Sequence, residues 1–377
     1  MRLQLIAAWA AGLVCASGGL ARAQDVTQQV DVHGFYYKET STRVVQPRME
    51  VLAQIPRTST LVGAEYSLDA ISSASIAAGN RVSDNILTEY RNQVGARVVQ
   101  SLNRLRLPVP ARVGANYLRS RESDYDSDTV GGQASVDLFE RNTTWTLAYS
   151  HSFDTVYDRP RRTRRDSLDT DFLSLSVAQL LSPTSVGVVG FEYAYLNGFQ
   201  QNPYRTVATA GNLNEVVPLI RNRYTAFGRV AKLLPASGTT LQAIYRFYHD
   251  DWGLNANTLE GRLYQDVTPN LDVRLAYRYY TQGHAYFAKA RYDTRVDQAY
   301  TSDPKLFAFD SHYIEGQARL HLSGLHGLQF WGWFENGFVE ATFGVLYSGS
   351  TFGNCGPLDP THECADKFLA LGLTLPL

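Results

Sequence analysis

Long segments of alternating apolar and polar residues recur along this chain, and a period of two predicts strands with two unlike faces. In residues 271–281 one face carries Leu, Val, Leu, Tyr and Tyr, and the other carries Asp, Arg, Ala, Arg and Tyr. Residues 90–98, 109–117 and 314–322 alternate in the same way. These candidates run for about 10–14 residues, whereas strands of globular proteins usually have about five or six. The length favours an all-β transmembrane barrel over a soluble sandwich.

The spacers between the strand candidates alternate between short and long. The short ones contain turn residues and are found at 56–58, 103–104, 141–142, 183–184, 235–238, 269–270 and 323–324. The long ones are polar and cover 70–88, 156–170, 198–221 and 283–310. Short periplasmic turns at one rim and long extracellular loops at the other are the plan of an antiparallel, up-and-down outer-membrane barrel.

Seven short turns give fourteen strands, and a leading strand (30–39) and a closing strand (368–377) bring the count to about 16, within a range of 14 to 18. Residues 328–347 are the uncertain part of this count, because Asn336-Gly337 could form a hairpin turn within them. In the closing strand Leu alternates correctly, but the last residue is Leu377 and not the aromatic residue usual for recognition by the barrel-assembly machinery.

Aromatic residues follow the predicted strand direction. The chain has 23 Tyr and 17 Phe. Strands that leave a short turn carry aromatics at their far ends, namely Tyr66, Tyr117, Tyr149, Phe153, Tyr193, Tyr195, Tyr277, Tyr279 and Tyr347. Strands that return from a long loop carry them at their starts, namely Tyr90, Tyr224 and Tyr313. Both sets fall at the long-loop rim, which predicts an interfacial aromatic girdle there.

The N-terminus is typical of a secretory signal. Arg2 precedes an apolar stretch, and Ala21-Arg22-Ala23 provides a small-x-small cleavage site, so residues 1–23 are expected to be removed and residues 24–377 to form the barrel. The alternatives are a retained signal anchor and a lipoprotein at Cys15, although Val14 precedes that cysteine where a small residue is wanted. No later segment has the ~18 continuous apolar residues of a membrane helix. We therefore expect Sec-type export to the outer membrane of a Gram-negative bacterium.

Two cysteines remain after cleavage, Cys355 and Cys364. In an oxidising periplasm such a pair is expected to form a local disulfide. The alternative is a metal site that adds His362 and Glu363, but the ligand spacing does not match a zinc knuckle.

Charged residues occupy the polar faces of the strands and are the candidates for lining a lumen. They are Glu89, Arg91, Arg97, Arg112, Arg246, Glu260, Arg262, Asp272, Arg274, Arg278, Glu315 and Arg319. One interpretation is a ladder of mutually neutralising charges, because a charge facing lipid at mid-depth costs about 2–4 kcal/mol. The other is a constriction that selects permeants. Arginine outnumbers acid in this set, which favours anionic solutes.

One predicted extracellular loop is strongly basic through Arg159, Arg161, Arg162, Arg164 and Arg165. Such a loop can bridge lipopolysaccharide phosphates, or bind an acidic polymer or surface ligand.

The sequence gives little support for an enzyme. In residues 149–153, Tyr-Ser-His-Ser-Phe, both serines are adjacent to His151 and thus lie on the opposite strand face, where His151 could not activate them. Residues 249–251, His-Asp-Asp, are interpreted as a solvated loop start, with a divalent-cation site as the alternative. Asp124, Asp126 and Asp128 resemble calcium ligands but lack the glycine and closing glutamate of a calcium loop. No cofactor is expected.

Several short motifs, taken in order, resemble a known family. They are Tyr37-Lys38-Glu39 with Arg43-Val44 and Pro47, Asp69-Ala70-Ile71-Ser72-Ser73-Ala74-Ser75, Leu181-Ser182-Pro183-Thr184, Asn202-Pro203-Tyr204-Arg205 with Val207, Ala285-Tyr286-Phe287, and Ser302-Asp303. Their order and spacing are similar to the bacterial domain of unknown function 3570. The resemblance implies an outer-membrane barrel with no established catalytic activity. The size and architecture are also similar to barrels that accompany polysaccharide export systems.

Together these patterns predict a porin-like conduit for a solute or a polymer, with exopolysaccharide export as one version. The alternative is a plugged structural or ligand-binding barrel that acts through its loops or a periplasmic partner. The expected partners are outer-membrane lipids, lipopolysaccharide, the barrel-assembly machinery and a periplasmic or export-system protein, and no nucleic acid. The chain alone does not name the permeant.

Overall fold

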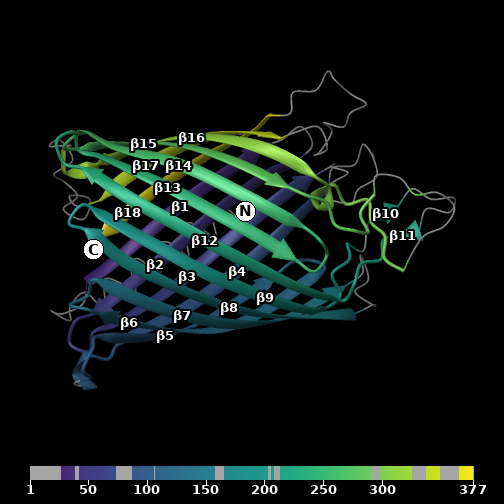
Figure 1. The fold of residues 1–377 in the computed structure, drawn as a ribbon, viewed down its shortest axis with the longest axis horizontal. Coiled ribbons are helices and arrows are strands. Elements are labelled where there is room, and N and C mark those ends of the chain that lie inside the picture. Colours follow the sequence, from purple (N-terminus) through teal and green to yellow (C-terminus); the bar gives the residue numbers. More distant parts are fainter. Residues whose placement is uncertain are drawn as a thin grey trace, which may run out of the picture.

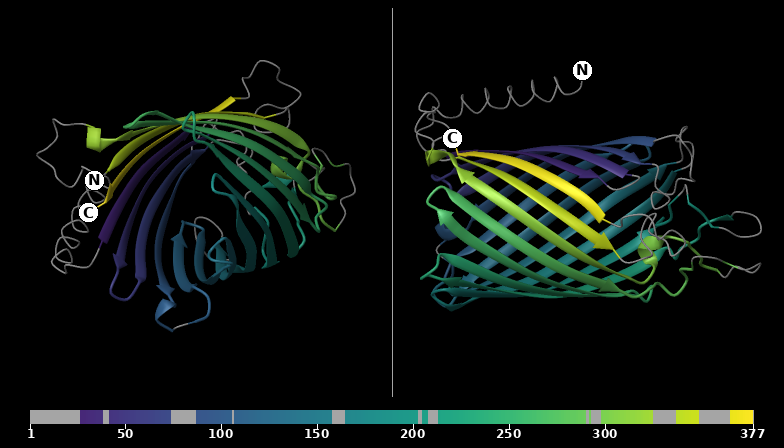
Figure 2. Two further views of the ribbon diagram at one scale, coloured as in Figure 1. Left: turned by 60° about the vertical axis from the view of Figure 1, so that its left-hand side comes forward. Right: turned by 90° about the horizontal axis from the view of Figure 1, so that it is seen from above.

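A computed structural model describes residues 27–38, 42–73, 87–105, 107–157, 165–202, 205–207, 213–289, 292, 298–324, 337–348 and 365–376. Within them, sixteen strands close into one antiparallel barrel, seen from the side in Figure 1 and obliquely from one end in Figure 2. The fold class and the strand count predicted from the alternation are thereby confirmed.

The barrel strands are long and tilted across the wall. In chain order they are β1 (Thr27–Lys38), β2 (Thr42–Ile55), β3 (Thr60–Ser73), β4 (Leu87–Ser101), β5 (Ala111–Arg121), β6 (Tyr125–Leu138), β7 (Thr143–Tyr157), β8 (Arg165–Ser182), β9 (Ser185–Gly198), β12 (Ile220–Leu234), β13 (Thr239–Asp250), β14 (Asn255–Thr268), β15 (Leu271–Gln282), β16 (Phe309–His321), β17 (Phe338–Ser348) and β18 (Ala365–Pro376). With 11 to 18 residues each, they are long enough to cross a bilayer at a tilt.

Each barrel strand pairs with its neighbours in the chain, so the topology is up-and-down. The first and last strands close the barrel, for example through the pairs Val30 with Leu375 and Tyr36 with Leu369. A closed barrel satisfies every backbone hydrogen-bonding group within the wall and leaves no sheet edge. The pair β10 (Thr206–Val207) and β11 (Leu213–Asn214) lies apart from the wall, between β9 and β12.

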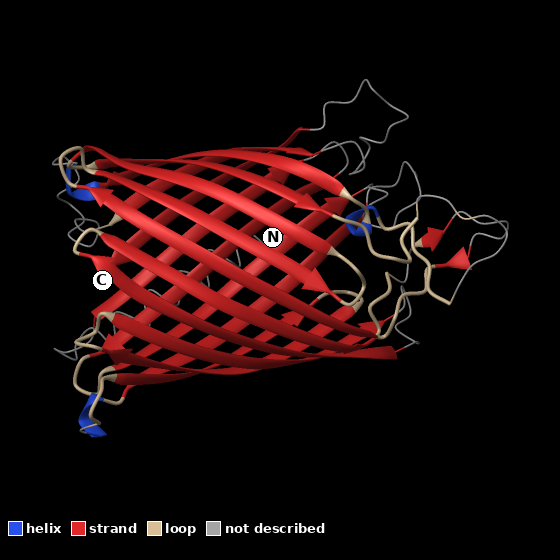
Figure 3. Cartoon of the chain, viewed as in Figure 1, coloured by secondary structure: helices blue, strands red, loops and turns tan. Residues whose placement is uncertain are grey.

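The two rims differ as the spacers predicted. One rim carries tight connections, such as the turn at residues 235–238, where Gly238 adopts a φ of +64° that a glycine accommodates without strain. The C-terminal strand ends at this rim, and the opposite rim carries the longer loops together with β10 and β11 (Figure 3). Helical structure among the described residues is restricted to three short 3₁₀ turns, Asn103–Leu105, Pro304–Leu306 and Leu322–Gly324. No described helix is long and apolar enough to cross a membrane.

The strands present large apolar side chains on one face, and these side chains are exposed. Val94 is 57% exposed, Leu147 48%, Val189 62% and Leu275 59%. Many of the neighbouring positions, which point the opposite way, carry polar or charged side chains, such as Gln93 beside Val94 and Arg274 beside Leu275. We call these two surfaces the apolar face and the charged face.

Several sequence expectations fall outside the described residues. They are the signal segment 1–23, Cys355 and Cys364, Asn336 of the Asn336-Gly337 turn, and the basic-loop residues Arg159, Arg161, Arg162 and Arg164. The fifth arginine of that loop, Arg165, is exposed and begins β8. Gly337 precedes β17, which begins at Phe338.

Candidate functional site: the charged face and the loop layer

Arginines of the charged face are paired with carboxylates on the next strand or on the strand beyond it. On β2, β3 and β4, an Arg97 Nη atom lies 2.5 Å from Glu50, and an Arg48 Nη atom lies 2.5 Å from Glu65. These side chains are half-buried, and each acid is more shielded than its arginine. Such cross-strand ion pairs lower the cost of placing charge along the wall.

Most residues predicted to line a lumen are paired as well, across strands or, for Arg262 and Glu260, within β14. Arg91 pairs with Asp69, Arg112 with Asp137 at 3.3 Å, Arg246 with Glu192 at 3.0 Å, Arg262 with Glu260, Arg274 with Glu315, and Arg319 with Glu340 at 3.2 Å. Asp272 bonds His321 at 2.8 Å. The Arg278 guanidinium lies over the Tyr313 ring, 4.7 Å from its centroid.

The arginine excess on the charged face is therefore smaller than the sequence candidates indicated. The carboxylates of Glu50, Glu65, Glu192 and Glu340 oppose arginines across strands, and none of them was in the predicted set. The alternation pattern describes one strand at a time and did not single out these glutamates. Their pairing with arginines depends on the register between strands. The geometry fits the neutralising ladder more closely than a uniformly basic lining.

Tyrosines on the apolar face form a recurring contact near the long-loop rim. Each donates a hydrogen bond to a polar side chain on the next strand: Tyr66 to Asn92, Tyr117 to Asp128, Tyr149 to Asp171, Tyr193 to Asn222 and Tyr245 to Asn257. Tyr277 shares one with His312. A ring with one apolar and one hydrogen-bonded end suits a membrane–water boundary, as the girdle prediction required.

Tyr313 is an exception to the predicted girdle. It lies at the correct rim, but its hydroxyl donates to Glu315 and its ring carries Arg278, so it belongs to the charged face. Its neighbour Ile314, 53% exposed, occupies the apolar face instead. Position along the strand predicts the rim, whereas the face follows from alternation, which places Tyr313 with Glu315 and not with Ile314.

The arrangement around His151 agrees with the opposite-face argument. His151 bonds Asp171 at 2.8 Å and packs against Phe153 on the apolar face. The Ser152 hydroxyl bonds Thr129 on the other face of the sheet. The imidazole and this hydroxyl are thus separated by the wall.

Above the long-loop rim, three loops pack into a layer that has its own small apolar core. Its buried members come from the connections β9–β12, β13–β14 and β15–β16, and they are Val217, Trp252, Leu254, Ala285, Phe287, Ala288 and Leu306. Trp252 and Phe287 meet edge to face with ring centroids 5.1 Å apart. We call this structure the loop layer; Figure 1 shows its outer part around β10 and β11.

Polar contacts join the loops of this layer across long stretches of chain. The backbones of Val216 and Tyr300 exchange two hydrogen bonds, of 3.0 and 2.7 Å. The Glu215 carboxylate accepts hydrogen bonds from the Thr301 hydroxyl and the Asn202 amide, each of 2.5 Å. Burial raises the pKa of the Glu215 carboxyl, and these two hydrogen bonds oppose the shift. Arg205, itself buried, pairs with Asp303 at 2.5 Å.

The burial of Asp250 contradicts the interpretation of residues 249–251 as a solvated loop start. Residues 249–251 were expected to be a solvated loop start, yet Asp250 is fully buried and receives hydrogen bonds from Arg221, Tyr248 and the Leu254 amide. Asp251 instead bonds Asn222, and His249 bonds Asn255. The three side chains have different partners, so the alternative of a shared cation site is wrong as well.

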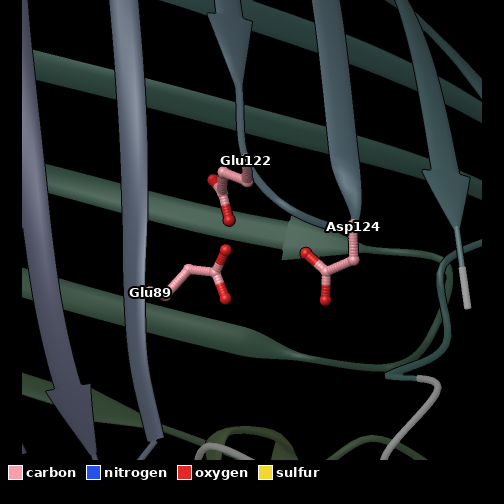
Figure 4. A group of neighbouring side chains, drawn as sticks. All are labelled: Glu89, Glu122 and Asp124. Atoms are coloured by element: carbon pink, nitrogen blue, oxygen red, sulfur yellow. The ribbon is translucent and has the colours of Figure 1, made fainter. Parts of the chain in front are cut away.

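Asp124, Asp126 and Asp128 do not converge either. Asp128 pairs with Arg119 and Asp126 lies 3.7 Å from Arg121. Asp124 instead lies beside Glu89 and Glu122, with one carboxylate oxygen of each within 4.8 Å of the others (Figure 4). Burial raises the pKa of the Glu122 carboxyl, the charge of Arg91 opposes the shift, and the charges of Asp124 and Asp69 add to it.

Motif residues that carried the family resemblance meet in the loop layer. Arg205 pairs with Asp303, the Asn202 amide bonds Glu215, and Ala285 and Phe287 belong to the apolar core. Along the sequence these motifs lie in separate predicted loops. The signal that could have joined them was the presence of apolar residues such as Trp252, Leu254 and Phe287 in connections expected to be polar.

The fold and its two unlike faces define a sixteen-stranded antiparallel barrel of the transmembrane type. The model of the family described as "Protein of unknown function (DUF3570)" matches residues 156–330. The family resemblance is confirmed over this segment, which includes the loop layer, while the motifs at 37–47 and 69–75 lie outside it. No curated protein matches the sequence.

Three solved structures are similar to the barrel at low identity. Pseudomonas aeruginosa OccD3 (OpdP) aligns with a TM-score of 0.46 and 10% identity over 93% of this chain and 91% of that chain. A bacterial polysaccharide outer membrane secretin gives a TM-score of 0.48 and 7% identity over 93% and 98%. Pseudomonas aeruginosa OccK2 (OpdF) in complex with glucuronate gives 0.45 and 9% over 94% and 99%.

Proposed function

We propose that the protein is a porin-like conduit of the Gram-negative outer membrane, and that the charged face lines a water-filled lumen through which a polar solute or a polymer passes. The observation that carries the proposal is that the barrel strands present exposed apolar side chains on one face, while the cross-strand ion pairs gather on the other. Exposed apolar residues such as Val189 and Leu275 avoid water when they face lipid. Paired charges such as Arg97 and Glu50 are then left on the inside, where water keeps them solvated.

Conductance of the purified full chain in planar bilayers tests this proposal. Discrete, ohmic steps in potassium chloride are expected, with weak selectivity between anions and cations because most arginines of the lining have an acidic partner. Absence of any current with the loops intact would exclude a passive conduit.

A second candidate, a plugged barrel that binds a ligand through its loops, is favoured by one observation. The loop layer has a buried core and cross-loop hydrogen bonds, so it is a packed structure at the mouth of the barrel. Replacing residues 286–305 by a short Gly/Ser linker separates the candidates. Current that appears only after this replacement identifies a plug or a gate, whereas equal current in both proteins supports the open conduit.

The proposal includes the predicted maturation and partners. The signal is removed after Ala23 following Sec-type export, the barrel-assembly machinery inserts the chain, and Arg165 with its neighbouring arginines contacts lipopolysaccharide phosphates. Mass spectrometry of the outer-membrane fraction is expected to give a chain that begins at Gln24 and carries a Cys355–Cys364 disulfide. A chain that keeps residues 1–23, or two free thiols, would contradict this part.

For the export version, a periplasmic or export-system partner delivers polysaccharide to the barrel. Deletion of the gene is then expected to reduce surface polysaccharide. Unchanged surface polysaccharide would exclude that version and leave the solute conduit untouched.

A further inference from the structure

Arg223 stands out among the arginines of the barrel that have a buried nitrogen atom. Three described arginines have a buried Nε atom without a hydrogen-bond partner, namely Arg223, Arg274 and Arg319. Two of them are neutralised, Arg274 by Glu315 and Arg319 by Glu340. No ion pair of Arg223 is found among the described residues. A guanidinium taken out of water needs an anion close by, so this one lacks its counterpart.

The acid closest in register accepts its hydrogen bonds from other groups. Arg223 lies opposite Asp250 in the pairing of β12 with β13. One oxygen of Asp250 accepts two hydrogen bonds from Arg221, of 2.9 and 2.5 Å, and a third from the Tyr248 hydroxyl. The other oxygen accepts the Leu254 amide at 2.9 Å. Its bonding capacity is therefore used by groups other than Arg223.

Among the residues that the structure describes, the charged groups around Arg223 sum to one net positive charge. Thr225, two residues further along the same face of β12, accepts a hydrogen bond of 3.4 Å from Arg246, whose own partner is Glu192. Three arginines, Arg221, Arg223 and Arg246, thus face two carboxylates, those of Asp250 and Glu192. The patch lies where the barrel wall meets the loop layer, because β12 begins and β13 ends at that rim.

We propose that the patch around Arg223 binds the carboxylate group of an anionic solute as it passes between the loop layer and the lumen. The planar fork of a guanidinium matches a carboxylate with two parallel hydrogen bonds, and a single unmatched charge fits a monoanion. The arginine is only partly buried, so it can be reached from one side. The inference rests on the proposed function in taking the charged face as the watery side of the barrel.

Binding is tested on the full chain in detergent micelles with benzoate as the probe. Trp252 reports on the patch, because the Arg221 guanidinium lies 4.0 Å from the centroid of its ring. Benzoate is expected to change the tryptophan emission in a saturable way. Benzamide, the neutral analogue of the same shape, is expected to have no such effect, and inorganic phosphate is expected to compete weakly. Equal responses to benzoate and benzamide, or tighter binding of phosphate, would overturn the assignment to a carboxylate.

Two variants on one strand provide the matched comparison. Arg223→Gln is expected to weaken benzoate binding by about tenfold or more, since a charge-assisted pair is lost. Arg229→Gln removes the same charge from an exposed position six residues further along β12, and it is expected to leave binding almost unchanged. Arg223→Lys, which keeps the charge but not the fork, is expected to bind with intermediate strength. Equal binding by the Arg223→Gln and Arg229→Gln variants would refute the proposal, once heat-dependent gel mobility has shown that both barrels are folded.

The same proteins separate this inference from the proposed function. Saturable benzoate binding without any bilayer current would leave the site standing and exclude the conduit. Current in potassium chloride without benzoate binding would support the conduit and refute the carboxylate site at Arg223.

Discussion

At the scale of single residues, burial determines which charges matter. Asp250 and Asp251 are adjacent in sequence and identical in chemistry, yet the first is fully buried among Arg221, Tyr248 and a backbone amide, and the second is exposed. Removing one member of a buried ion pair leaves the other charge uncompensated, which typically costs about 3–5 kcal/mol. Removing one member of an exposed ion pair costs much less stability.

The Asp250→Asn variant is therefore expected to lower the free energy of unfolding by about 3–5 kcal/mol, because Arg221 loses its anion and Arg223 is left beside it. Denaturant titration in lipid vesicles, followed by tryptophan emission, measures the change. Asp251→Asn, which disturbs only the 2.7 Å bond from Asn222, is the matched control and is expected to stay close to the unmodified chain. A similar loss in both variants would show that burial of Asp250 is not the cause.

Glu215 gives the loop layer a dependence on pH. Its folded pKa is raised by burial, with Arg205 and Asp303 as the charged groups that face it. The unfolded value of a glutamate is about 4.3, so its protonation stabilises the packed loops fully below that pH and the contribution is lost as the pH rises through the raised folded pKa. Hydrogen exchange of the Val216 and Tyr300 amides, corrected for intrinsic rates, is expected to show easier opening toward neutral pH. Glu215→Gln is expected to flatten this trend, and an unchanged slope in that variant would assign the trend to another group.

At the scale of elements, the loop layer is a unit distinct from the barrel wall. Its members come from three connections, and its contacts join residues as far apart in the chain as Glu215 and Thr301. The wall is held by ladders between sequence neighbours. Two such units are expected to respond separately to mutation.

Phe287→Ala is expected to open the loop layer without weakening the barrel. Truncating a buried phenylalanine typically costs about 3–5 kcal/mol, and here the loss falls on the core shared with Trp252. Amide exchange at Ala285 and Lys289 is expected to rise, while that of the β15 and β16 strands stays constant. The neighbouring Tyr286 is 63% exposed, and Tyr286→Ala serves as the control with little expected change. Faster exchange throughout both strands would mean that the layer and the wall unfold together.

At the scale of the whole molecule, alternation was enough to predict the barrel but not the site. A period of two needs only the strand's own residues, so the sixteen strands, the two kinds of rim and the girdle positions could be predicted. The partners Glu50 and Glu340 depend on register between strands, and the packing of Trp252 on Phe287 depends on loops that alternation does not describe. In sequence, Arg223 is not distinguished from the other arginines of the charged face. Its lack of an ion pair follows only from the contacts of Asp250, which lies opposite it.

The assignment of the two faces leads to the last prediction, which uses the pair of strands β6 and β7. Leu147 on the apolar face lies opposite Ala134, and the adjacent Ala148 lies opposite Gln133 on the charged face. Leu147→Arg would place a charge in lipid, which costs about 2–4 kcal/mol near mid-depth. Gln133→Arg would place the same charge on the charged face, where the Gln133 side chain already lies over Gly114. Refolding into vesicles, followed by heat-dependent gel mobility and denaturant titration, is expected to be impaired for Leu147→Arg and nearly normal for Gln133→Arg. If Gln133→Arg impaired refolding and Leu147→Arg did not, the assignment of the faces would be wrong. The charged face would then contact lipid and the apolar face would line the interior.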